Sequence, residues 1–271
     1  MLQATNITFA YDSTLVLRGV SIEVPQGGLV GILGPNGSGK TTLLKVLAGT
    51  RKPTSGSVTL DGYDLRRIPR ALVARRMSVV PQETQLAFDY SVLEVVLMGR
   101  YPHLAAFEIE GPQDYELARR ALEATGTAGF EARPFATLSG GEKQRVIIAA
   151  ALAQISSPAG APAPVLLLDE PTAALDLAYQ LEIAALLRDL RDRLHLSMVL
   201  STHDLNFAAS VCSSLVLLRD GRVLASGPTE EVLTTSAVRD LYGVEADVHR
   251  HAAAGHLVVT PIRRSLAGAR R

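Results

Sequence analysis

A glycine-rich stretch at residues 34–42 constrains the fold of this chain most. It reads Gly-Pro-Asn-Gly-Ser-Gly-Lys-Thr-Thr and fits the phosphate-binding pattern G-x-x-x-x-G-K-[ST]. An apolar run at 29–33 precedes it and a run with helical character at 42–47 follows it, which is the strand, loop and helix order that the pattern requires. Glycines allow backbone N–H groups to turn inward around phosphates, and the helix N-terminus adds partial positive charge. The sequence therefore predicts an α/β fold that holds a nucleoside triphosphate.

Two side chains of this loop have predicted roles in binding the triphosphate. Lys40 is expected to reach the outer phosphates, and the hydroxyl of Thr41 is expected to coordinate Mg²⁺. The residues predicted to contact the nucleotide are Gly34, Pro35, Asn36, Gly37, Ser38, Gly39, Lys40, Thr41 and Thr42.

The composition describes a well-filled globular core, since 47% of the 271 residues are hydrophobic. Lys and Arg total 27, and Asp and Glu also total 27, so no overall positive field attracts nucleic acid. The single cysteine, Cys212, excludes an internal disulfide and a cysteine metal cluster. We expect no nucleic-acid partner.

No N-terminal secretory signal is visible, because the first residues lack both a basic start and a long apolar stretch. The longest uncharged run, residues 146–168, contains Gln154, a glycine and three prolines, and it does not resemble a membrane span. We therefore expect the chain to stay in the cytoplasm and to reach a membrane only through a partner.

Short apolar segments alternate with helical segments along the chain, which is typical of a parallel sheet covered by helices. The strands expected in this sheet are residues 29–33, 77–80, 165–168 and 198–201. Further half-buried strands are expected in the first 30 residues and at 57–60, and the turn Asp220-Gly221 predicts a hairpin.

The segment between residues 91 and 153 is mostly helical in pattern and is interpreted as a helical subdomain inserted in the core. Helices are expected at 91–99, 113–125 and 139–153. A later helix should bury one stripe, formed by Ile183, Leu187, Leu190 and Leu194. The last segment, 261–271, carries four arginines and is expected to be frayed.

Two carboxylates, Asp169 and Glu170, directly follow the apolar strand at 165–168. Adjacent acids after a strand are common by chance, but here they follow a complete phosphate loop. Asp169 is expected to help hold Mg²⁺, and Glu170 to polarise the water that attacks the phosphate. The sequence therefore predicts hydrolysis as well as binding.

A third motif, Leu138-Ser139-Gly140-Gly141-Glu142, begins 98 positions beyond Lys40 and opens a helical stretch. On its own it is a helix-capping box. With the first two motifs, however, the chain resembles the ATP-binding cassette (ABC) transporter ATPase family over roughly residues 2–233. The resemblance implies a P-loop NTPase core of the ABC type with an N-terminal antiparallel β-subdomain and the helical subdomain at about 88–155. The ABC ATPase domain would span 1–250, and a C-terminal extension with a basic tail would span 251–271.

The resemblance assigns further residues to the site. Tyr11 would stack on adenine, although a tyrosine at a strand end is also a common structural feature. Gln82 would touch Mg²⁺ and the attacking water, and His203 would contact the γ-phosphate and orient Glu170. The residues expected to act in catalysis are thus Lys40, Gln82, Glu170 and His203, and those at Mg²⁺ are Thr41, Gln82 and Asp169.

In this family the site is completed by a second copy of the chain. Ser139, Gly140, Gly141 and Glu142 of one copy would close over the nucleotide held by the loop of the other. The loop Ala174-Leu175-Asp176, and Asp176 in particular, would pass signals between the two ATPase sites. Closure would require ATP, because only ATP supplies γ-phosphate contacts.

The segment 95–103, which contains Gly-Arg-Tyr-Pro-His, resembles the ATPases that power uptake of iron–siderophore, haem and cobalamin complexes. Glu142 in place of the commoner glutamine suits that branch, and the loop 156–164 is similar to that of haem importers. The resemblance implies two permease subunits docked near residues 82–103 and an external substrate-binding protein. The chain would then lie on the cytoplasmic face of the inner membrane as a peripheral subunit.

A non-transport role stays open at this point. Soluble ABC ATPases of DNA repair carry long heptad arms and those of translation carry two cassettes, and neither feature is present. An ATPase of iron–sulfur cluster assembly is harder to separate from an importer subunit, although the Gly-Arg-Tyr-Pro-His segment argues for the importer.

Overall fold

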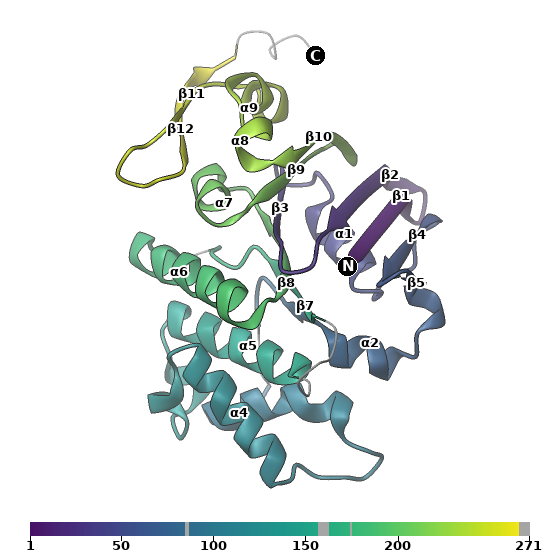
Figure 1. The fold of residues 1–271 in the computed structure, drawn as a ribbon, viewed down its shortest axis with the longest axis vertical. Helices are drawn as coiled ribbons and strands as arrows, with labels where there is room; N and C mark the ends of the chain where they lie inside the picture. The colour runs from purple at the N-terminus through teal and green to yellow at the C-terminus, as the bar shows by residue number, and fades with distance from the viewer. Residues whose placement is uncertain (85–86, 157–162, 174, 266–271) are drawn as a thin grey trace.

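The computed structural model describes residues 1–84, 87–156, 163–173 and 175–265, and a six-stranded sheet forms its centre (Figure 1). In spatial order the strands are β10 (Arg222–Pro228), β9 (Ser214–Arg219), β3 (Leu29–Leu33), β8 (Ser197–Thr202), β7 (Val165–Asp169) and β6 (Met77–Val80). All neighbours are parallel except β10, which pairs antiparallel with β9 in the predicted hairpin. Every residue of β3, β7 and β8 is buried, which explains their nearly continuous apolar sequences.

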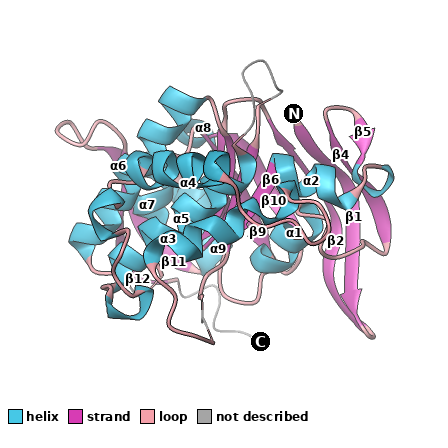
Figure 2. Cartoon of the chain, turned by 90° about the horizontal axis from the view of Figure 1, so that it is seen from below, coloured by secondary structure: helices cyan, strands magenta, loops and turns pink. Residues whose placement is uncertain are grey.

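A second, antiparallel sheet lies beside helix α1 (Lys40–Leu47) and is formed by the N-terminal part of the chain. Its order is β2 (Thr14–Val24), β1 (Leu2–Tyr11), β4 (Ser55–Leu60) and β5 (Tyr63–Asp64). Its inward side chains form one hydrophobic cluster with α1 and with one face of the central sheet. Figure 2 shows this sheet on one side of the molecule and the larger helices on the other. The predicted fold class is confirmed.

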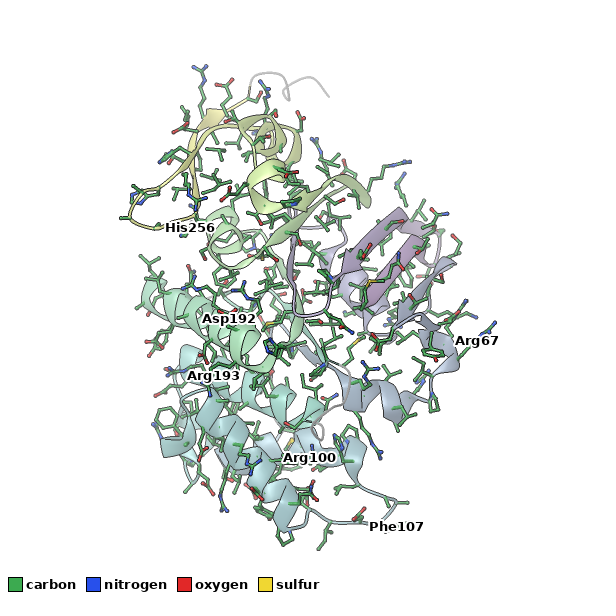
Figure 3. All side chains as sticks on the ribbon, viewed as in Figure 1. Arg67, Arg100, Phe107, Asp192, Arg193 and His256 are labelled. Carbon is green, nitrogen blue, oxygen red and sulfur yellow. The ribbon has the colours of Figure 1, made fainter. Side chains whose placement is uncertain are left out.

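Between β6 and β7 the chain forms the helical region that the sequence predicts. It contains α3 (Val92–Leu97), α4 (Pro112–Ala124) and α5 (Gly140–Ile155), with 3-10 turns at Met98–His103, Ala128–Phe130 and Phe135–Thr137. The buried Arg100 lies inside this region (Figure 3), where its guanidinium bonds Asp114 Oδ1 at 2.9 Å and the carbonyl of Ala153 at 2.6 Å. A buried, paired arginine thus ties the 3-10 turn to α4 and α5.

Helix α6 (Leu177–Leu194) confirms most of the predicted stripe, because Ile183, Leu187 and Leu190 are buried. Leu194 is 46% exposed, so its assignment to the buried stripe was wrong. The helix ends there: His195 adopts the left-handed conformation with φ 49°, which turns the chain away from the helix axis.

The C-terminal part was predicted least well. No helix was predicted there at α7 (Leu205–Val211), α8 (Thr229–Val232) or α9 (Thr235–Tyr242). Earlier in the chain, helix α2 (Arg70–Arg76), which follows the 3-10 turn Leu65–Arg67, also lacked a prediction. Strands β11 (Val244–Arg250) and β12 (Leu257–Arg264) form a hairpin, so the expectation that residues 261–264 are frayed was wrong. Residues 266–271 lie outside the described residues. The boundary after residue 250 falls between the two strands and stays a prediction.

Among the helices of the described residues, none has the length and apolar character needed to cross a membrane.

Candidate functional site

The loop at residues 34–39 connects β3 to α1 and curves tightly around its own backbone. Gly37 and Gly39 have positive φ angles of 80° and 104°, which favour glycine. At Gly34, a Cβ atom would come within 2.2 Å of the carbonyl oxygen of Leu218, so no side chain fits. The backbone conformation of the loop therefore accounts for the glycines at these three positions.

The concave side of this loop offers donors suited to an anion. Helix α1 begins with Lys40, has no acidic residue in its first turn and receives no side-chain cap, so its first N–H groups are available. Ser38 is 3% exposed, and among the described residues its buried Oγ has no hydrogen-bond partner. A buried, unpaired hydroxyl is costly unless a ligand satisfies it, so these residues fit a phosphate group.

Lys40 lies along the loop with its charge largely buried. Its Nζ donates to the carbonyl of Gly34 at 2.9 Å and to that of Pro35 at 3.3 Å, and it lies 3.3 Å from Oε1 of Glu170. The charge is thus paired within the site rather than with a surface group.

Asp169, the last residue of β7, meets the start of α1. Thr41 Oγ1 donates to Asp169 Oδ1 at 3.0 Å, and Ser201 Oγ of β8 donates to the same oxygen at 2.6 Å. The carboxylate is buried, with 7% exposure. Hydroxyl and carboxylate oxygens next to a phosphate loop are the donors that Mg²⁺ prefers.

Glu170 projects from the same sheet edge with an unusual backbone. Its φ is 45°, a left-handed value that costs a non-glycine residue about 1 kcal/mol. Its N–H donates to both the carbonyl and the hydroxyl of Ser201, each at 3.1 Å, and these bonds hold the conformation. His203 Nδ1 lies 3.2 Å from Oε2 of Glu170, so the carboxylate sits between Lys40 and His203.

Ser139 caps helix α5, as predicted from the sequence. Its hydroxyl accepts from the N–H of Glu142 at 3.3 Å, and the Glu142 carboxylate accepts from the N–H of Ser139 at 2.7 Å. This backbone hydrogen bond is the main cause that lowers the pKa of Glu142. Gly141 packs so closely on the ring of Tyr179 that a Cβ would lie 2.1 Å from it.

The hydrogen bonds of Ser139 do not lead to the phosphate loop of its own chain. Its side chain also contacts Tyr179 OH at 3.3 Å, and Tyr179 N–H donates to Asp176, which caps α6 at 3.1 Å. Ser139 and Asp176 therefore share one neighbour, Tyr179. Ala174, the first residue of the predicted communication loop, lies outside the described residues, as does most of the loop 156–164.

Tyr11 and Gln82 have fewer contacts in the structure. Tyr11 ends β1 with its ring 38% exposed, edge-on to Phe9 at 4.8 Å and with the Arg51 guanidinium 5.9 Å from its centroid. Gln82 follows β6 and is exposed, and among the described residues no hydrogen bond joins it to Thr41 or Asp169. Their predicted roles stay predictions.

Ser201 is a site residue that the sequence analysis did not assign. It bonds both Asp169 and Glu170, and it is directly opposite Asp169 in the parallel pairing of β7 and β8. That register could have identified it, because neighbouring parallel strands end at the same sheet edge. A second unassigned residue, Tyr242, donates its hydroxyl to the carbonyl of His203 at 3.2 Å. It lies 39 positions away, and no local pattern marks it.

Comparison with known proteins gives one family match. The family model described as ABC transporter matches residues 17–173. The hemin import ATP-binding protein of Gloeobacter violaceus is 43% identical over 263 residues, covering 97% of this chain and 94% of the relative. The cobalamin import ATP-binding protein of Halobacterium salinarum is 40% identical over 261 residues, covering 96% of this chain but 63% of the relative, so the chain spans less than two thirds of that protein.

Solved structures give the same result. An inward-facing metal-chelate type ABC transporter matches with a TM-score of 0.83 at 30% identity, covering 96% of both chains. A dimeric bacterial ABC transporter cassette matches with a TM-score of 0.71 at 28% identity, covering 84% of this chain and 99% of the other.

Proposed function

Because this chain belongs to the ABC transporter family, we propose that it is the ATP-binding subunit of an importer that hydrolyses ATP to drive uptake of a metal chelate through a separate permease. The chelate class is an iron–siderophore, haem or cobalamin, supported by the relatives named for hemin and cobalamin import. The observation that carries the ATPase activity is the convergence of Lys40, Thr41, Asp169 and Glu170 beside one phosphate loop.

The triphosphate would lie against the loop at residues 34–39, with Lys40 on the outer phosphates. Phosphoryl transfer depends mostly on positioning and on charge neutralisation, which Lys40 and the α1 N-terminus supply. Glu170 would accept a hydrogen bond from the attacking water, and His203 would keep that carboxylate in place through Nδ1. Water then bonds to the γ-phosphorus as the bond to the ADP oxygen breaks.

We assign a Mg²⁺ ion to the oxygens of Thr41 and Asp169, with Gln82 as a further ligand. The Thr41 hydroxyl and the Asp169 carboxylate are already hydrogen-bonded to each other at 3.0 Å. When bound, the ion would neutralise charge on the phosphates. Ser201 would orient Asp169 for this purpose, because its hydroxyl bonds the oxygen that faces Thr41.

A second copy of the chain would complete the site with Ser139, Gly140, Gly141 and Glu142. In the described part of the chain the side chain of Ser139 bonds only Glu142 and Tyr179, so no hydrogen bond joins it to the phosphate loop of its own chain. Asp176, joined to Ser139 through Tyr179, would sense the partner's site. The dimeric cassette of similar fold supports this arrangement.

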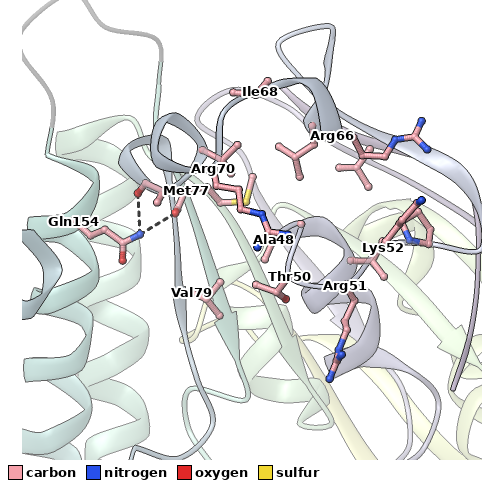
Figure 4. A pocket seen from close by; sticks show the side chains of 17 residues that line it. Ala48, Thr50, Arg51, Lys52, Arg66, Ile68, Arg70, Met77, Val79 and Gln154 are labelled. Carbon is pink, nitrogen blue, oxygen red and sulfur yellow. Dashed lines mark hydrogen bonds between the residues drawn. The ribbon is translucent and has the colours of Figure 1, made fainter. Parts of the chain in front are cut away.

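The permease would dock near residues 82–103. Next to this segment lies a hollow of about 530 Å³ between β6, α2 and the loop after α1 (Figure 4). Apolar Val73, Met77 and Val79 line it, and Arg51, Lys52 and Arg70 add positive charge. A cytoplasmic segment of the permease with apolar and acidic residues would suit this hollow by charge and by its apolar surface.

Gln154 connects this surface to the helix that carries Ser139. Its amide nitrogen donates to the carbonyl of Ala74 at 2.8 Å and to that of Met77 at 3.1 Å, and its oxygen accepts from Ser78 Oγ at 3.0 Å. Movement of the permease against β6 would therefore be transmitted to α5 through these hydrogen bonds. An external substrate-binding protein would deliver the chelate to the permease, and the subunit would lie at the cytoplasmic face of the inner membrane.

Reconstitution tests the proposal. The chain is placed in liposomes with its permease, and ATP-dependent uptake is measured for a panel of haem, cobalamin and siderophore complexes. The importer function is supported if the unsubstituted protein drives uptake of one class of chelate and the Glu170→Gln variant does not. Hydrolysis without uptake of any chelate, together with co-purification of cluster-assembly proteins, would contradict it.

A further inference from the structure

The C-terminal segment from α9 to β12 packs on the connection between β8 and α7, which carries His203. In Figure 1 the hairpin β11–β12 lies beside α7 at one end of the molecule. The segment contributes Val238, Leu241, Ala246 and Val259 to the main hydrophobic core. It is therefore an integral part of the fold, although it lies outside the residues that match the family model.

Two contacts link this segment to His203 and to Asn206, three residues further along the chain. Tyr242 of α9 donates its hydroxyl to the carbonyl of His203 at 3.2 Å. Asn206, the second residue of α7, pairs with Val259 of β12 in both directions: Oδ1 accepts from Val259 N–H at 2.7 Å and Nδ2 donates to the Val259 carbonyl at 3.2 Å. The amide side chain of Asn206 thus forms the two hydrogen bonds with Val259 that the backbone of a neighbouring strand would form.

The hydroxyl of Tyr242 is a permanent donor. Burial is the main cause that raises its pKa, and the carboxylates of Asp204 and Glu170 raise it further. The phenol therefore stays protonated throughout the range in which the protein works.

His203 has few other restraints. Its side chain is 54% exposed, and among the described residues its ring is hydrogen-bonded only to Glu170, through Nδ1 at 3.2 Å. The next residue, Asp204, is held locally by Thr202 Oγ1 and by its own capping of α7. The Tyr242 hydroxyl is the group that fixes the His203 carbonyl, and so the peptide from which the imidazole projects.

We propose that Tyr242, supported by the Asn206–Val259 pair, is a positioning residue for ATP hydrolysis. It holds the His203 backbone so that Nδ1 meets Glu170, and Glu170 in turn aligns the attacking water. The proposal rests on the proposed function, because it assigns Tyr242 to the same hydrolytic site. It gives two contacts of the C-terminal segment, those made by Tyr242 and Val259, a role in positioning the hydrolytic site.

The test is Tyr242→Phe, which removes one oxygen and keeps the ring. Loss of a single hydrogen bond that acts on the transition state predicts a fall in kcat of about three- to tenfold. The KM for ATP should change less than about twofold, because the phosphate loop is untouched. Glu245→Gln is the matched control, since it removes an ion pair with Arg263 within the hairpin and should leave kcat unchanged.

A double variant separates positioning from general destabilisation. If Tyr242 acts through His203, adding Tyr242→Phe to His203→Ala lowers single-turnover hydrolysis no further. An equal loss in both backgrounds would overturn the proposal, and so would an unchanged kcat in the single variant. Absence of hydrolysis by the unsubstituted protein would instead contradict the proposed function.

Hydrogen exchange gives a readout that does not depend on activity. In the nucleotide-free protein, Tyr242→Phe and Asn206→Leu should both raise deuterium uptake in residues 202–206 and leave residues 139–155 unchanged. Uniform uptake changes across the chain would show that these residues stabilise the fold only, and would overturn the proposal.

Discussion

The Nζ atom of Lys40 lies 3.3 Å from Oε1 of Glu170, and the exposures of the two side chains are only 5% and 11%. Opposite charges at this separation attract strongly where water is largely excluded. Lys40 is also the group proposed to bind the outer phosphates. A γ-phosphate therefore competes with Glu170 for the lysine, and nucleotide binding is expected to weaken the Lys40–Glu170 contact and leave the carboxylate to the attacking water.

Replacing Lys40 by methionine should remove ATP binding and also destabilise the nucleotide-free protein. Glu170 would lose its cation in a buried place, which costs about 3 kcal/mol. Adding Glu170→Gln should recover part of that stability without recovering ATP affinity. Calorimetric titration with ATP and thermal unfolding measure the two effects separately.

The control for this pair is Lys45→Met, on the exposed face of the same helix. It should change ATP affinity less than about twofold. Equal losses for Lys40→Met and Lys45→Met would mean that helix α1, rather than the Lys40 charge, determines binding.

Glu170→Gln should leave ATP binding intact and reduce hydrolysis by about 10²-fold or more, because the amide cannot take a proton from water. The γ-phosphate then persists, and an ATP-bound dimer should accumulate. Phosphate release and size-exclusion chromatography with ATP measure both. Glu182→Gln, which removes an exposed partner of Arg145 on α6, serves as the control. Turnover within twofold of normal would remove Glu170 from its proposed role.

The part of the site that could be predicted from sequence is the part set by parallel strands. Lys40, Asp169 and Glu170 lie at strand ends or helix starts along the same sheet edge, so local motifs were enough to bring them together, and the family resemblance added His203. Ser201 was missed because its role depends on the register between β7 and β8, which no single segment encodes.

Two of the missed elements, α2 and β12, share a physical cause, which is weak hydrophobic periodicity. Helix α2 has no fully buried residue, so its sequence carries no apolar stripe. In β12 five of the eight residues are exposed and two of them are arginines, which made the strand look like a frayed tail. The pairing of Asn206 with Val259 spans 53 positions, and such a contact leaves no local signal.

Ser139 should act on the partner's nucleotide, and mixing two inactive variants tests this. Ser139→Arg should block hydrolysis while the monomer still binds ATP, and Lys40→Met should block it by losing ATP. A mixed dimer contains one composite site in which both residues are normal. Mixing equal amounts should therefore restore measurable phosphate release, with each variant alone as the control. No recovery in dimers shown to be mixed would mean that Ser139 serves its own chain.

The pH dependence of stability should depend on His103, whose Nε2 donates to the carbonyl of Gln154 at 2.7 Å. Burial is the main cause that lowers the pKa of His103, and Arg100 and Arg75 lower it further, while the bond to Gln154 and the Asp114 carboxylate oppose this. The unfolded chain therefore takes up the proton at a higher pH than the folded protein does. Above the ordinary histidine pKa of about 6.5, His103 is neutral in both states and does not lower the free energy of unfolding. As the pH falls from there through the folded pKa, the free energy of unfolding decreases, because the unfolded chain binds the proton more readily.

His103→Gln should remove this part of the pH dependence while keeping a donor for Gln154. The Tm of the unsubstituted protein should fall more steeply between about pH 7 and pH 5 than that of the variant, and the two curves should run parallel above pH 7. Comparing the two proteins cancels the carboxylates, which titrate alike in both. His251→Gln, in the turn of the β11–β12 hairpin, is the control and should follow the unsubstituted protein. A steeper loss in His103→Gln than in the unsubstituted protein would mean that the imidazole is held charged, with the Asp114 carboxylate and the Gln154 carbonyl outweighing burial and the two arginines.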